Sequence, residues 1–377
     1  ELEFQETYIW RQAKSFVDKN PIKNYIESDL INNLSPSEKF DLLLNNEAAE
    51  LPLTKAMWAE GERYLINSDE VEKWMGICHG WAPASFMVER PKRSITVKSA
   101  NNRDIKFYPS DIKSLASLLW AKGEFQNHFV GGRCNSKDPE ENEDGRITRQ
   151  ECRDNNPATF HLAVTNALGI HRKTFVMDAT YDYEVWNQPL SSYSLNFFNV
   201  SQSQEYGDLS KVIVKKEDFK DDPYKEYRSS NTKYILGVSL EVVYSVETKP
   251  SQRDYDAFNF DDHNTANYFY DLELDENFNI IGGEWYYSEH PDFLWRPVEN
   301  SQALTVYDYY LMSDSHWDGK SPLESKYREL GNKASSRGAP LAYIVNSLIK
   351  LSNEGFQGLE DINLEELEHV EIIENFE

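Results

Sequence analysis

The spacing of the apolar residues changes once along the chain. Before about residue 170 it is mostly helical, as at Ile112, Leu115 and Leu119, which would share one face of a helix. After about residue 173 apolar and polar residues alternate, as in 238–246, which is typical of a half-buried strand. Helices followed by antiparallel strands predict an α+β fold.

Shorter segments support this division of the chain. Residues 36–44 and 54–66 are expected to be helices, and 94–108 alternate like a hairpin around a polar turn. Residues 268–274 are expected to pair with 281–287 across a turn. The later part of the chain is therefore predicted to be an antiparallel sheet.

The chain has 377 residues, enough for two or three domains. We predict a helical N-terminal segment over 1–70, packed on a core over 71–300 that has a helical lobe followed by a β lobe. Residues 301–377 are predicted to be a C-terminal extension that is helical and acidic. No run of about 18 apolar residues occurs, so no membrane span is predicted.

The net charge of -25 argues against nucleic acid as a partner, because phosphates would be repelled. An aromatic content of 13% excludes disorder for most of the chain. The sequence begins at Glu1 without methionine, so we expect a processed product that is secreted, extracellular or periplasmic.

Two of the three cysteines, Cys134 and Cys152, flank a polar, turn-rich loop. In an oxidising compartment we expect them to form a disulfide, which would contribute roughly 3 kcal/mol in the chain-entropy model. The alternative is two buried free thiols. In either case Cys78 is left over, and an unpaired thiol in a secreted chain is unusual.

Cys78 lies between Gly76 and Gly80, where a helix is expected to begin and run to about Glu89, with Pro83 in its first turn. A helix start presents free backbone N–H groups and the positive end of the dipole, which favour a thiolate. Cys78 is therefore a candidate nucleophile. The alternative is a cysteine that only fills space in the core.

A cysteine nucleophile needs a base and a group that orients the base. His161 is preferred over His79, which would point to another face of its helix. His161 lies in a segment that is predicted to be a helix with Asn156 as its N-cap. A strand at 160–165 is the alternative. Asp178 ends a short apolar strand, where a buried carboxylate needs a partner such as an imidazole N–H. The alternatives are a core histidine and an aspartate that caps a turn at Thr180.

Residues 140–151 resemble a calcium loop, with oxygen ligands at positions 1, 3 and 5, glycine at position 6 and glutamate at position 12. The predicted Ca²⁺ ligands are the side chains of Glu140, Asn142, Asp144 and Glu151 and the backbone carbonyl of Arg146. The alternative is a solvated acidic loop. Trp74 and Trp81, which flank Cys78, are candidates for the walls of a substrate cleft.

Four motifs resemble one family: GICHGWA at 76–82, RDNNP at 153–157, MDATYD at 177–182 and VWNQP from Val185 to Pro189. The chain is similar there to the oomycete cell-wall transglutaminase elicitors and their bacterial relatives. The resemblance implies a papain-like, transglutaminase-like core and a calcium-dependent protein-glutamine γ-glutamyltransferase. It also implies Cys78 as nucleophile, His161 as acid and base, and Asp178 as the orienting group.

The predicted activity is formation of an isopeptide bond between glutamine and a lysine or other amine through a cysteine thioester. The partners would be protein substrates that carry these residues, and the segment from Val185 to Pro189 is a candidate contact for a host receptor. Two alternatives stay open. One is a papain-like cysteine protease or amidase with the same triad, and the other is a non-catalytic secreted recognition protein.

Overall fold

The structure is a computed structural model that describes residues 7–28, 30–44, 50–68, 71–72, 74–134, 136, 140, 142, 155–180, 183–202, 205–287 and 289–354. The helices are α1 (Thr7–Lys19), α2 (Ile22–Glu27), α3 (Pro36–Leu44), α4 (Pro52–Ser68), α5 (Cys78–Met87), α6 (Pro109–Lys122), α7 (Pro157–Ala163), α8 (Leu209–Val212), α9 (Ser325–Ser335) and α10 (Ala342–Asn353). The strands are β1 (Ile95–Lys98), β2 (Asp104–Phe107), β3 (Asn127–Gly131), β4 (Val176–Asp178), β5 (Asn187–Asn199), β6 (Glu205–Tyr206), β7 (Val214–Lys215), β8 (Tyr234–Val246), β9 (Asp262–Leu274), β10 (Ile280–Trp285) and β11 (Phe293–Pro297). Short 3-10 turns are η1 (Ile31–Asn33), η4 (Lys216–Asp218), η5 (Phe258–Phe260) and η6 (Asp308–Tyr310), and η3 (Val164–Ile170) is a π-helical continuation of α7.

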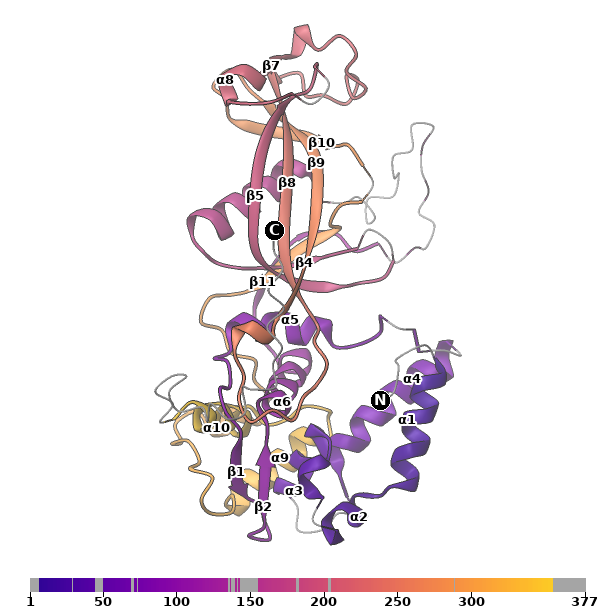
Figure 1. Cartoon of the computed structure of the whole chain (residues 1–377), viewed down its shortest axis with the longest axis vertical. Helices are drawn as coiled ribbons and strands as arrows, with labels where there is room; N and C mark the ends of the chain where they lie inside the picture. Colours follow the sequence, from indigo (N-terminus) through magenta and orange to yellow (C-terminus); the bar gives the residue numbers. More distant parts are fainter. Residues whose placement is uncertain are drawn as a thin grey trace, which may run out of the picture.

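Helices and strands separate into two regions, with the long strands in the upper half of Figure 1 and most helices in the lower half. The larger sheet has the order β10-β9-β8-β5-β4-β11-β3, and its neighbouring strands run antiparallel. α5 lies where the two regions meet. The predicted α+β class is confirmed, as a helical region joined to a curled antiparallel sheet.

Most local predictions are confirmed. α3 has the predicted bounds, α4 extends the predicted helix at both ends, and β1 pairs with β2 as a hairpin. β9 and β10 pair across a turn in which the Asp275 carboxylate accepts backbone N–H groups of Asn277 and Asn279. These elements depend on signals within a few residues of each other, which a sequence displays directly.

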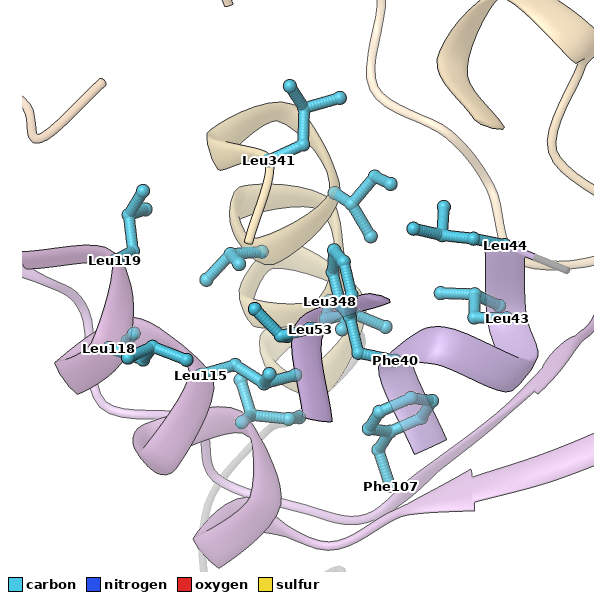
Figure 2. Close-up of a cluster of buried hydrophobic side chains, with 14 of the residues drawn as sticks. Phe40, Leu43, Leu44, Leu53, Phe107, Leu115, Leu118, Leu119, Leu341 and Leu348 are labelled. Carbon is cyan, nitrogen blue, oxygen red and sulfur yellow. The ribbon is translucent and has the colours of Figure 1, made fainter. Parts of the chain in front are cut away.

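The helical region has one apolar core that both ends of the chain build (Figure 2). Phe40 and Leu43 of α3 meet Leu115 of α6 and Leu348 of α10 in this cluster, and all four side chains are buried. Residues beyond 300 thus supply part of the main helical core. The division at residues 70 and 300 stays a prediction, but α10 is integral to the helical region.

The part of the sheet formed by β4 and β11 carries a helix on each face. α5 covers one face through Ala82, which clusters with Val176 and Trp295. α7 covers the other, where Phe160 clusters with Met177. Because successive residues of a strand point to opposite faces, Val176 and Met177 face different helices. α5 and α7 are therefore separated by the sheet.

α7 forms as a helix because its first turn is capped. The Asn156 side chain accepts the backbone N–H of Ala158, and Pro157 occupies the first helical position. The strand alternative at 160–165 is wrong. In α5, by contrast, Pro83 lies at the sixth position and not in the first turn, which corrects the expected placement of this proline.

α5 is held close to α6 at Gly80. A β-carbon on Gly80 would lie 2.3 Å from the backbone oxygen of Ser117 and 2.5 Å from the β-carbon of Ala121. Only glycine permits this approach, which sets the position of the first turn of α5. Among the residues that the structure describes, no helix has both the length and the apolar character needed to cross a bilayer.

Candidate active site

Cys78 is the first residue of α5 and is a free, half-buried thiol. Its Sγ lies 3.4 Å from Nδ2 of Asn187 and 3.5 Å from the backbone oxygen of Val185. Asn187 is the first residue of β5 and Val185 lies two residues before it, both more than 100 positions from Cys78 in sequence. The expected helix start at Cys78 is confirmed, and the thiol meets a side-chain N–H donor there.

A cavity of about 1040 Å³ opens beside Cys78. Its walls include residues of α1, α4, the end of α6, β3 and β11, so the N-terminal helices border the same cavity as the thiol. Trp74 lines this cavity, as do Trp10 and Trp58, whose rings form an edge-to-face pair with centroids 5.8 Å apart. Trp81 is not among the lining residues, and its indole N–H donates to Glu247 over 2.8 Å.

His161 lies in α7 and is buried on the face of the sheet opposite α5. Its Nδ1 is 2.9 Å from the hydroxyl of Tyr270 in β9. Burial lowers the pKa of His161 to about 4, so the imidazole is neutral at neutral pH. His161 thus lies on the α7 side of the sheet, and its role as the catalytic base stays a prediction.

Asp178 ends β4 and is fully buried. Its Oδ1 accepts the backbone N–H of Trp186 over 2.9 Å and the hydroxyl of Thr180 over 3.0 Å. Its Oδ2 has no hydrogen-bond partner among the described residues. No hydrogen bond joins it to His161, so within the described residues the predicted line of sulfur, imidazole and carboxylate is not formed.

Asp178 nevertheless shares a face with the site of Cys78. Asp178 is directly opposite Asn187 in the β4–β5 ladder, and opposed residues of antiparallel strands point to the same face. Asn187 reaches the thiol, so the structure brings Asp178 to the side of the sheet that carries Cys78. It does not bring His161 there.

Replacing Asp178 with asparagine is expected to change how stability depends on pH. Burial raises the pKa of Asp178 to about 6, so the native state holds the proton more tightly than the unfolded chain does. The stabilisation is complete below pH ~4 and is lost as pH rises through ~6. Asparagine does not ionise, so Asp178→Asn should gain up to about 3 kcal/mol relative to wild type between pH 4 and 7.

Urea unfolding at pH 4 and pH 7 measures this difference. Asp275→Asn is the control, because hydrogen bonds from Asn279 lower the pKa of Asp275 and the sign of its pH effect reverses. A stability difference between Asp178→Asn and wild type that is the same at both pH values would contradict the prediction.

His79 is the histidine that lines the cavity with Cys78 among the described residues. Burial lowers its pKa, with a further contribution from Lys122. Its position on the helix next to the thiol makes it a second candidate for proton transfer. The sequence favoured His161 because His79, next to Cys78 on a helix, was expected to point to another face, yet His79 lines the same cavity as Cys78.

The segment from Val185 to Pro189 is not a displayed loop. Asn187, Gln188 and Pro189 are buried at the start of β5, and only Val185 and Trp186 are partly accessible. A receptor contact through this segment stays a prediction, and Val185 and Trp186 are its partly accessible residues. The segment contributes Asn187 to the site instead.

Sequence reasoning missed Asn187 and Trp295 as residues of the site. Trp295 of β11 is buried and its indole N–H donates to Oδ1 of Asn187 over 2.7 Å. The available signal was a run of polar residues, Asn187 and Gln188, at the start of a strand next to apolar Leu190. Buried amides of this kind are hydrogen-bonded, which marks them as positioned groups.

Two predicted features fall outside the described residues. In the loop over 140–151 the structure describes only Glu140 and Asn142, and Asp144, Arg146 and Glu151 lie beyond it. Cys152, the expected disulfide partner of Cys134, also lies beyond it. The calcium site and the disulfide both stay predictions.

Two of three comparisons with known proteins find matches for this chain. The family profile described as transglutaminase elicitor matches residues 64–314. Among solved structures, the chain is similar to the crystal structure of the GP42 transglutaminase from Phytophthora sojae, with a TM-score of 0.53 and 22% sequence identity over 84% of this chain and 82% of that chain. At that identity the likeness concerns the fold alone. No curated protein matches the chain.

The matched range contains Cys78, its hydrogen-bond partner Asn187, and Trp295, which donates a hydrogen bond to Asn187. It also covers well over half of the chain, and the family predicted from the sequence motifs is confirmed. The chain belongs to the transglutaminase elicitor family.

Proposed function

We propose that this chain is a secreted protein-glutamine γ-glutamyltransferase of papain-like fold with Cys78 as its nucleophile. The observation that carries the proposal is the free thiol at the first residue of α5, which borders a large cavity and receives an amide N–H from Asn187. Membership of the transglutaminase elicitor family supports the same chemistry. The substrates are proteins that offer a glutamine and a lysine.

The reaction has two half-steps. The Cys78 thiolate attacks the carbon of the glutamine γ-carboxamide, and the carbon–nitrogen bond breaks as the nitrogen takes a proton and leaves as ammonia. A lysine amine then attacks the thioester carbonyl, loses a proton and displaces the thiolate. The aromatic walls given by Trp10, Trp58 and Trp74 favour an amine over water as the acceptor, because they keep water from the thioester.

Two histidines are candidates for the proton transfers. The family resemblance implies His161, which would have to leave Tyr270 and pass to the other face of the sheet. His79 already borders the cavity that Cys78 lines. Asp178 then orients the imidazole through Oδ2, the carboxylate oxygen that has no partner among the described residues.

The test is incorporation of a fluorescent primary amine into casein, with calcium or with a chelator. Wild type is expected to label casein. The chelator tests whether this activity depends on Ca²⁺, which the predicted loop over 140–151 would bind. Variants His161→Ala and His79→Ala identify the base, since the variant that lacks it should lose at least roughly 10²-fold in rate.

Other outcomes distinguish the alternative functions. Release of ammonia from casein or cleavage of the casein chain, with no amine incorporated, would replace this proposal with a cysteine amidase or protease. Absence of all three products with calcium present would leave a non-catalytic recognition protein. Either result would overturn the transglutaminase assignment.

A further inference from the structure

Asn187 is a side chain that meets the thiol and for which the sequence predicted no catalytic role. It lies at the first position of β5 and is 4% exposed. Its Nδ2 is 3.4 Å from Sγ of Cys78. A buried amide that gives one of its N–H groups to a free thiol is placed where a bond to sulfur would form.

The orientation of this amide is fixed by Trp295. The indole nitrogen of Trp295 can only donate, so the atom 2.7 Å from it must be the oxygen of Asn187. The amide nitrogen therefore has to face the sulfur. Trp295 is itself held in place, because it is 8% exposed and stacked on Phe125 with ring centroids 6.3 Å apart.

This geometry suits a developing negative charge better than a resting thiol. In the neutral form the S–H group can donate to the backbone oxygen of Val185, 3.5 Å away. Once an acyl group is bound to Sγ, its carbonyl oxygen is two bonds from the sulfur and within reach of the same amide N–H. Cys78 is also the first residue of α5, where the helix leaves backbone N–H groups without intrahelical partners.

We propose that Asn187 is a catalytic residue that donates its amide N–H to the oxyanion, and that Trp295 is the positioning residue that orients it. The proposal rests on the proposed function and names the side-chain donor that the acyl transfer needs. When the thiolate forms its bond to the carboxamide carbon, the carbonyl π pair moves to oxygen. That oxyanion accepts the N–H groups of Asn187 and Cys78, then collapses as ammonia leaves.

The test uses the full chain and two reagents that need no glutamine. Release of nitrophenolate from p-nitrophenyl acetate reports acylation of the thiol and passes through an oxyanion, whereas alkylation by iodoacetamide does not. Each rate is corrected with the Cys78→Ala background. Asn187→Asp keeps the shape of the side chain and removes the donor, and Asn187→Ala removes both.

Both Asn187 variants are expected to lose roughly 10²–10³-fold in acylation rate, with KM nearly unchanged and alkylation by iodoacetamide reduced less than tenfold. Trp295→Phe should show an intermediate loss, since the amide becomes free to turn. Trp295→Phe also keeps the proposal testable if the Asn187 variants do not fold, as judged by circular dichroism.

Acylation within threefold of wild type in a folded Asn187 variant would overturn the proposal. In a preparation where neither Asn187 variant folds, unchanged acylation of Trp295→Phe would do the same. An equal fall in acylation and alkylation would also overturn it, because the residue would then act on the thiol alone. Failure of the proposed function looks different, since the wild type would then acylate normally while incorporating no amine into casein.

Discussion

Cys78→Ala is expected to abolish incorporation of a fluorescent amine into casein, with a loss of at least roughly 10³-fold in rate. The thiol is the only group at the start of α5 that can form the covalent thioester, and alanine leaves no nucleophile there. Because the side chain is half-buried and small, the variant should fold like wild type. Its melting temperature measured by circular dichroism checks that point.

Ser85→Ala is the matched control for this variant. Ser85 lies on the exposed side of α5, and its hydroxyl donates only to the backbone oxygen of Ala82. Activity of Ser85→Ala should stay within twofold of wild type. Labelling of casein by Cys78→Ala at the wild-type rate would remove Cys78 as nucleophile and with it the proposed mechanism.

Much of the local structure could be predicted because its signals are local. Examples are the N-cap at Asn156, the proline at position 157 and the turn at Asp275. Each involves residues only a few positions apart in the sequence. The setting of Cys78 between two glycines likewise predicted the start of a helix, and the structure begins α5 at that residue. These interactions need no knowledge of the tertiary fold.

The partners of the thiol could not be predicted in the same way. Whether His161 reaches Cys78 depends on which face of the sheet α7 covers, and this follows from the register of β4 and the order of the strands. A shift of one residue in that register would exchange Val176 with Met177 between the two faces. Asn187 approaches Cys78 for the same reason, as the ladder partner of Asp178.

Arg228→Met is expected to lower the free energy of unfolding by about 3–5 kcal/mol. The guanidinium, with no exposed side-chain surface, pairs with Asp271 over 2.7 Å and with Asp222 over 3.0 Å, and both carboxylates are buried. Methionine keeps the apolar stem but leaves these two carboxylates, and that of Glu273 3.8 Å from the guanidinium, buried without this cation. Urea unfolding at pH 7 measures the loss.

Arg253→Met is the control, since Arg253 is exposed and stacks on the ring of Phe260. Its effect should stay within about 0.5 kcal/mol. If Arg228→Met also lowered the free energy of unfolding by no more than about 0.5 kcal/mol, the buried ion pairs would make no net contribution to stability.

The uncompensated charge also has a pH signature. Burial raises the pKa of Asp271 while Arg228 lowers it, so without Arg228 the carboxyl should take up a proton more readily in the native state. The cost of Arg228→Met should therefore shrink as pH falls toward 4, because a protonated Asp271 no longer needs the cation. Adding Asp271→Asn to Arg228→Met should recover part of the stability at pH 7 for the same reason.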